Sequence, residues 1–142
     1  MRIIFIGQLY TDGQLDYFIS HGSNVDIAAH TFQRALLDGM KQPDIKIDVI
    51  STPYVSCYPK AKLLHINGGI SNKGIIIHSV PFINIVGIKH LSKFLNIRKK
   101  LRQILTNNED WRIVIYGIHS PFLLSLLGLK RDYKYKTCLI VP

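Results

Sequence analysis

Acidic side chains and cysteines are both scarce in this sequence of 142 residues. There are nine acidic residues against 18 basic ones, and Glu109 is the only glutamate. Hydrolysis by paired carboxylates needs two acids in one cleft, and we discount it because the few acids fall mostly in expected turns and on helix surfaces. Cys57 and Cys138 stand far apart and form no CxxC, which excludes a disulfide framework and a zinc knuckle. Reduced thiols fit the cytoplasm.

Long hydrophobic runs and the common nucleotide or metal motifs are also absent. The longest run, 122–129, is interrupted by Ser125 and Gly128, and it is far shorter than the roughly 20 residues that cross a bilayer. The apolar stretch at 1–7 is too short for a signal peptide. The sequence contains no GxGxxG, GxxxxGK[ST], HExxH or GxSxG. We therefore expect no spanning segment, no secretion signal, no metal and no bound cofactor.

The apolar residues that are present predict a single α/β domain over 1–142. Hydrophobic residues make up 47% of the chain, enough for a core. Helical periodicity predicts helices at 25–40, 88–106 and 121–129, with Ser23 or Asn24 capping the first. Short β-branched runs predict strands at 2–6, 45–50, 74–78, 82–86, 111–117 and 137–141. Residues 8–22 are expected to form a long loop, and residues 52–72 a loop insertion that could contain a short strand at 63–66. This alternation favours an open parallel sheet with helices on both faces.

The positive charge is concentrated in the middle of the chain. Residues 1–48 carry a net charge of −2, residues 49–108 carry +9 with no acid, and residues 109–142 carry +2. Such a block suits an anionic partner, although a solvated basic face is an equal alternative. The expected helix at 88–106 could lie on an anionic membrane, where each basic residue contributes about 1 kcal/mol, or it could be an ordinary outer helix. Its basic residues are Lys89, Lys93, Arg98, Lys99, Lys100 and Arg102. Nucleic acid is not expected, because the aromatics are not arrayed with the cations.

Two places along the chain are candidates for ligand binding. The loop from the first strand into the first helix could offer free amides to an anion or a polar sugar, and its small or polar members are Gly7, Gly22, Ser23 and Asn24. Ordinary helix capping is the alternative. His119 lies two residues beyond the strand that ends at Gly117, where a neutral imidazole could bind a substrate hydroxyl. A capping or core histidine is the alternative there, and His78 is the next candidate.

Several stretches in order resemble the N-terminal half of a bacterial GT-B (family 4-type) glycosyltransferase. They are the segments MRIIFIG at 1–7, GSNVDIAA at 22–29, FQRAL at 32–36, VIYGIHSPFLL at 114–124 and KTCLIVP at 136–142. The resemblance implies a Rossmann-like, acceptor-side domain of a retaining, metal-independent hexosyltransferase of polysaccharide biosynthesis. His119 matches the family histidine that contacts the donor sugar, which makes it the expected catalytic residue. Gly22 and Ser23 match the glycine-rich segment beside the cleft, where relatives often have two glycines.

The same resemblance implies a nucleotide-sugar donor and a sugar acceptor, but the chain lacks the residues that the family uses to bind the donor. The family holds its nucleotide-sugar donor through a Glu-x7-Glu pair in a second domain, and a chain with Glu109 as its only glutamate lacks that pair. We therefore expect the C-terminal nucleotide-sugar domain to be absent and the chain to be inactive alone. The implied acceptor is a saccharide or a lipid-linked sugar, and the implied location is the cytoplasm, peripheral to the inner face of the membrane.

Two alternatives from other classes stay open. The first is a non-catalytic subunit that anchors a separate glycosyltransferase chain at the membrane, which would need an exposed apolar patch. The second is a small nucleotide-binding α/β protein of unrelated function, which would bind nucleotide tightly by itself.

Overall fold

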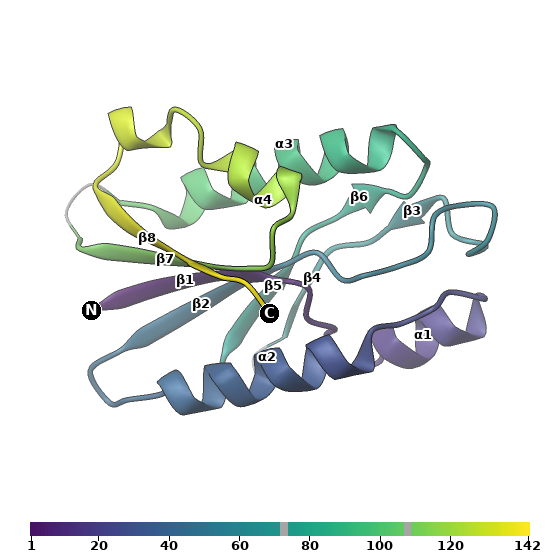
Figure 1. Ribbon diagram of the computed structural model, residues 1–142, viewed down its shortest axis with the longest axis horizontal. Coiled ribbons are helices and arrows are strands. Elements are labelled where there is room, and N and C mark those ends of the chain that lie inside the picture. Colours follow the sequence, from purple (N-terminus) through teal and green to yellow (C-terminus); the bar gives the residue numbers. More distant parts are fainter. Residues whose placement is uncertain (72–73, 107–108) are drawn as a thin grey trace.

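A six-stranded sheet of order β4-β5-β2-β1-β7-β8 forms the centre of the computed structural model, which describes residues 1–71, 74–106 and 109–142 (Figure 1). Within the described part of the chain, five strands of this sheet are parallel and only β4 is antiparallel to its neighbour. In chain order the elements are β1 (Arg2–Gly7), α1 (Gln14–Ser20), α2 (Ile27–Met40), β2 (Lys46–Ser51), β3 (His65–Ile66), β4 (Gly69–Ser71), β5 (Ile76–Ser79), β6 (Phe82–Ile83), α3 (Ile88–Ile104), β7 (Trp111–Tyr116), α4 (Ser120–Ser125), the 3-10 turn η1 (Leu129–Arg131) and β8 (Tyr135–Ile140).

Strand β1 is buried on both faces because it lies between β2 and β7 in the middle of the sheet. Ile4 and Ile6 join the hydrophobic cluster beneath α3 and α4, whereas Ile3 and Phe5 join the cluster beneath α2. Figure 1 shows α2 on one side of the sheet and α3 and α4 on the other. The expectation of an α/β fold with a mostly parallel sheet and helices on both faces is confirmed. Within the described ranges, no helix has the length and apolar character needed to cross a bilayer.

The segments expected to be long loops contain regular structure that the sequence analysis missed. Residues 14–20, expected to be loop, form α1, whose Phe18 is buried in a small third cluster with Tyr10 and Phe82. A single buried aromatic in the seven-residue helix α1 leaves too little periodicity to recognise from the sequence.

The cap of helix α2 also differs from the expectation: it is Asp26, not Ser23 or Asn24.

The long insertion after β2 is held together by Asn84, which is fully buried. Its side-chain amide donates hydrogen bonds to the carbonyls of Ser56, at 2.7 Å, and Leu63, at 3.0 Å. Its own backbone carbonyl accepts from the amide of Tyr58 at 2.9 Å. The short β3–β6 ladder lies beside it. These contacts give the 52–67 segment a defined shape, and part of that segment forms one wall of the candidate site.

Helix α3 is oriented differently from the basic helix expected at 88–106. Its buried residues are Lys89, Lys93, Ile97 and Leu101, whereas Leu91 and Leu95 are 57% and 53% exposed. Lys89 and Lys93 are therefore not on the surface face to which they were assigned. The spacing of four residues places both lysines in line with Ile97 and Leu101, so their stems pack in the interior with the apolar residues.

Candidate functional site

A crevice of about 260 Å³ opens at the carboxyl ends of the central strands. From β1 the chain passes to β2 on one side and later returns to β7 on the other. Such a switch point is where ligands bind in open α/β sheets. Gln8 follows β1, Cys57 lies in the segment after β2, and His119 follows β7. These three residues line the crevice together with Lys89, His90 and Lys93 at the start of α3.

Two buried lysines give the crevice its chemical character. Lys89 and Lys93 are 8% and 6% exposed, and no aspartate or glutamate within the described ranges lines the crevice. The ammonium group of Lys89 donates to the backbone carbonyl of Val55 and lies 3.7 Å from the sulfur of Cys57. The Lys93 ammonium lies 4.4 Å from the ring centre of Phe82, with no ion pair among the described residues. Buried cations are normally paired, so these two leave a positive charge for a ligand to neutralise.

Burial changes the protonation of these amines. Loss of solvation and, secondarily, the charge of Lys89 lower the pKa of Lys93 to about 7. Burial also lowers the pKa of Lys89, although Cys57 acts in the opposite direction. Lys93 is therefore close to half protonated at neutral pH, and an anion that enters the crevice would favour its charged form.

His119 reaches the crevice from the start of α4. It occupies the N-cap position but makes no side-chain capping bond, and its ring meets Phe122 edge-on at 5.1 Å between centroids. Burial, and then the charges of Lys93 and His90, lower the pKa of His119. The imidazole is therefore neutral at pH 7 and can exchange a hydrogen bond with a hydroxyl group. Gly117 leaves room for it: φ is +83° there, and a Cβ would lie 3.0 Å from Nε2 of His119.

The other expected ligand-binding residues lie outside the crevice. A Cβ on Gly7 would meet Oε1 of Gln33 at 2.2 Å, so this glycine permits close packing between β1 and α2. Gly22 turns the chain after α1 with φ +77°. The Ser23 hydroxyl accepts from the amide of Ser56 at 2.9 Å, and the amide of Asn24 donates to the Ser56 hydroxyl at 3.1 Å. Residues 22–24 therefore do not line the crevice but hold in place Ser56, which does; the part of the crevice lining around Ser56 is called the Ser56 wall below.

The N-terminus of α2, where an anion or a polar sugar was expected to bind, is capped by a carboxylate side chain. The carboxylate of Asp26 accepts from the amide of Ala29 at 2.9 Å and so occupies the N-terminus of α2. A second anion at the same position would be repelled by this carboxylate. The intervening helix α1 also separates β1 from α2, which the sequence analysis did not anticipate.

Lys89, His90, Lys93 and Cys57 were missed as members of the candidate site. A helical projection anchored on Ile97 and Leu101 would have placed both lysines on the buried face. The described residues contain no group of three or more His, Cys, Asp or Glu side chains that could hold a metal ion. The lysines that line the crevice can pair with anionic groups of a ligand, and its histidines can form hydrogen bonds with hydroxyl groups.

Comparison with known proteins does not identify a family. No protein-family model matches the sequence, and neither the curated proteins nor the solved structures give a significant match. The structure defines the class of fold, an α/β domain with a crevice at its switch point, and the chemistry of that crevice is the basis for a functional assignment.

Proposed function

We propose that this chain is the acceptor-side domain of a retaining hexosyltransferase and that the crevice binds an anionic, hydroxyl-rich acceptor such as a diphosphate-linked sugar. The observation that carries the proposal is the pair of buried lysines, which face a crevice without carboxylates beside His119. Diphosphate oxygens would pair with Lys89 and Lys93. A sugar hydroxyl would bind the neutral His119 imidazole.

The donor side of the reaction would lie in another domain or chain. The sequence lacks the paired glutamates that the resemblance requires for binding a nucleotide-sugar. Catalysis in such an enzyme consists largely of positioning and electrostatic stabilisation, and this domain would supply the acceptor half of both. We propose a cytoplasmic location, which agrees with the free thiols of Cys57 and Cys138. By itself the chain is expected to transfer no sugar.

A titration followed by NMR tests this function on the 142-residue chain. The probes are a soluble short-chain prenyl diphosphate–hexose and UDP-glucose. The prenyl compound should shift the ring signals of His119 and His90 and the amide of Gly117. Lys93→Met should weaken this binding about tenfold, the typical effect of losing one charge-assisted contact.

The matched control is Lys62→Met, which removes an exposed lysine that lines no part of the crevice and should leave binding within about twofold. If the prenyl compound leaves His119 unmoved, the acceptor-side assignment is wrong. Tight binding of UDP-glucose without the prenyl compound would instead favour a nucleotide-binding protein. Measurable sugar transfer by the chain alone would contradict its expected inactivity.

A second candidate, membrane anchoring of a separate catalytic chain, is favoured by the outer face of α3. Ile88, Leu91 and Leu95 are each about half exposed and share one face at helical spacing. The same face continues into Lys99 and Arg102, which are also exposed. An apolar start followed by basic residues suits the interface of an anionic bilayer. Of the six basic residues first assigned to such a surface, Lys89 and Lys93 no longer contribute.

Vesicle co-sedimentation tests this second candidate. The double variant Leu91→Ser/Leu95→Ser should bind vesicles containing phosphatidylglycerol at least about tenfold less than the unmodified chain, because burial of each leucine contributes about 1.5–3 kcal/mol. Leu127→Ser is the control, since Leu127 is 61% exposed but lies beyond the end of α4. Equal binding by all three proteins would refute membrane contact through α3.

A further inference from the structure

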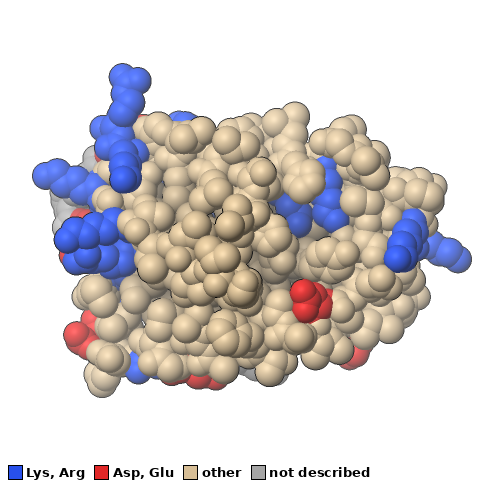
Figure 2. Space-filling view, viewed as in Figure 1, with Lys and Arg blue, Asp and Glu red and all other residues tan. Residues whose placement is uncertain are grey.

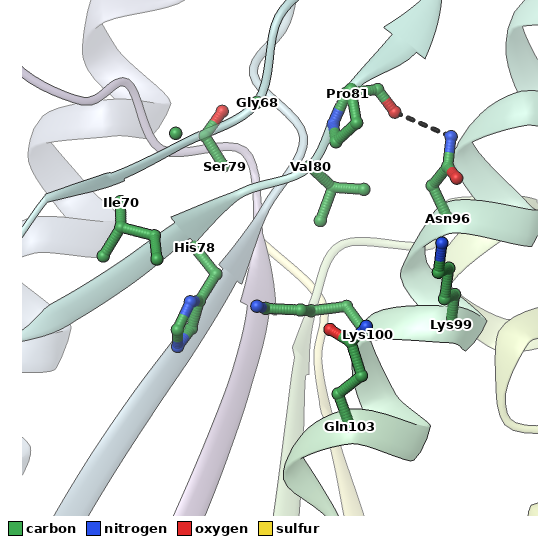
Figure 3. A pocket seen from close by; sticks show the side chains of 11 residues that line it. Gly68, Ile70, His78, Ser79, Val80, Pro81, Asn96, Lys99, Lys100 and Gln103 are labelled. Carbon is green, nitrogen blue, oxygen red and sulfur yellow. Dashed lines mark hydrogen bonds between the residues drawn. The ribbon is translucent and has the colours of Figure 1, made fainter.

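A second pocket of about 300 Å³ lies between the edge strand β4, its neighbour β5 and the C-terminal half of α3. Figure 3 shows its residues: Lys99, Lys100 and Gln103 extend from α3, and His78 and Ile70 face them from the sheet. This pocket shares no residue with the crevice that contains His119. Nothing proposed above for the crevice depends on it.

The described lining of the second pocket carries lysines but no carboxylate. Among the described residues, two lysines and no aspartate or glutamate line it, and the sequence 49–108 contains no acidic residue. Lys100 is half-buried and reaches across the pocket towards His78 (Figure 3). Its side chain forms no hydrogen bond or ion pair with the described residues. A half-buried ammonium directed into a concave space without a partner is a favourable contact for an oxyanion.

His78, towards which Lys100 points, has a ring nitrogen without a hydrogen-bond partner among the described residues. Its Nε2 lies 3.6 Å from a carboxylate oxygen of Asp48, and its buried Nδ1 has no hydrogen-bond partner among the described residues. Burial, and then Lys100, lower the pKa of His78 against the opposing effect of Asp48, so the ring is neutral at pH 7. A buried polar atom without a partner is uncommon. Because His78 lines the pocket, a polar group bound there could complete its hydrogen bonding.

The opposite wall of the pocket is apolar. Ile70 is 68% exposed at its rim, and Val80 and Pro81 continue this wall. A ligand that fits must therefore carry an anionic end towards the lysines and an organic group against Ile70. We propose that this second pocket binds an organic phosphomonoester, with its phosphate at Lys99 and Lys100 and its organic group on Ile70. At pH 7 a phosphomonoester carries a charge of about −1.5 to −2, which suits two cations beside a neutral imidazole.

The proposal is tested by NMR titration of the full chain with phenyl phosphate and with inorganic phosphate at constant ionic strength. Phenyl phosphate should give saturable shifts at the amides of Gly68, Gly69 and His78, and inorganic phosphate should bind more weakly there. Lys100→Gln should weaken phenyl phosphate binding about fivefold to tenfold. Arg102→Gln is the matched control, because it removes one charge from the same helix outside the pocket and should change the affinity less than about twofold.

The organic phosphate could be a soluble molecule or a lipid headgroup, and vesicles distinguish the two. A preference for phosphatidic acid over phosphatidylglycerol at equal surface charge, lost in Lys100→Gln, would identify a phosphomonoester headgroup. Binding of phenyl phosphate without that preference would identify a soluble ligand. The proposal is overturned if neither probe gives saturable shifts at Gly68, Gly69 or His78 and no lipid preference is seen. Equal weakening by Lys100→Gln and Arg102→Gln would overturn it as well.

Discussion

The buried amine of Lys93 should make the stability of the protein depend strongly on pH. Its folded-state pKa of about 7 lies well below the ordinary value of 10.5. Below about pH 7 the lysine is protonated in both states, and the full cost of burying a charge opposes folding. Between about pH 7 and about pH 10.5 the unfolded chain binds more protons, so the free energy of unfolding rises with pH.

The size of this effect follows from the two pKa values. A difference of about 3.5 in pKa corresponds to about 5 kcal/mol, at 1.36 kcal/mol for each pKa unit. The Phe82 ring, 4.4 Å from the ammonium, favours the charged form, which makes this figure an upper limit. Replacing Lys93 by methionine keeps the stem and removes the amine. We therefore expect Lys93→Met to be more stable than the unmodified protein by about 2–4 kcal/mol at about pH 6.

The assay is urea unfolding followed by the fluorescence of Trp111, which is fully buried, at several pH values between about 6 and 10. The difference between the two proteins should shrink by up to about 1.4 kcal/mol for each pH unit above 7. Lys99→Met, an exposed change on the same helix, should show the unmodified pH dependence. A constant difference between Lys93→Met and the unmodified protein across this range would refute the reasoning, because it would mean that the amine titrates alike in both states.

Three further predictions concern the crevice and the loops around it. Asn84→Ala should lower the free energy of unfolding by about 2–4 kcal/mol, measured by urea titration, because it leaves two buried carbonyls without donors. Gly117→Ala should cost about 1 kcal/mol or more at φ +83°, and it should shift the ring signals of His119; unchanged ring signals would show that Gly117 does not position the histidine. Binding of the prenyl diphosphate–hexose should weaken as pH rises above about 7, because Lys93 loses its proton there, and isothermal calorimetry on Lys93→Met should find a flatter pH profile.

The sheet was largely predictable, because its strands carry their own signal. The run Arg2–Gly7 is apolar on every residue from Ile3 to Ile6, as a strand buried on both faces requires. The expected strands at 45–50 and 111–117 match β2 and β7 to within a residue or two. A position at the carboxyl edge for His119 followed directly from its distance beyond β7, and the structure confirms that position.

The rest of the candidate site depends on tertiary contacts that local pattern does not reveal. Lysine was assigned to the solvent face by its residue type, yet Lys89 and Lys93 follow the buried repeat that continues at Ile97. The Ser56 wall exists because Ser23, 33 residues earlier, pairs with it. Gly7 was chosen for its small size, which in fact makes room for Gln33 and not for a ligand. The last two are long-range packing choices without a signature in their own segments of sequence, whereas the two lysines follow a helical repeat that lies within α3.

The central place of β1 has a consequence for the order of events during synthesis. Strand β1 precedes both of its partners in the chain: it pairs on one side with β2 and on the other with β7, whose last residue is Tyr116. At about 5–20 residues per second, roughly 5–20 seconds pass between the appearance of the first strand and that of its second partner. During this interval the segment Arg2–Gly7 offers an unpaired, isoleucine-rich edge to other chains. Nascent copies should therefore depend on chaperones that bind unfolded chains more than the folded domain does.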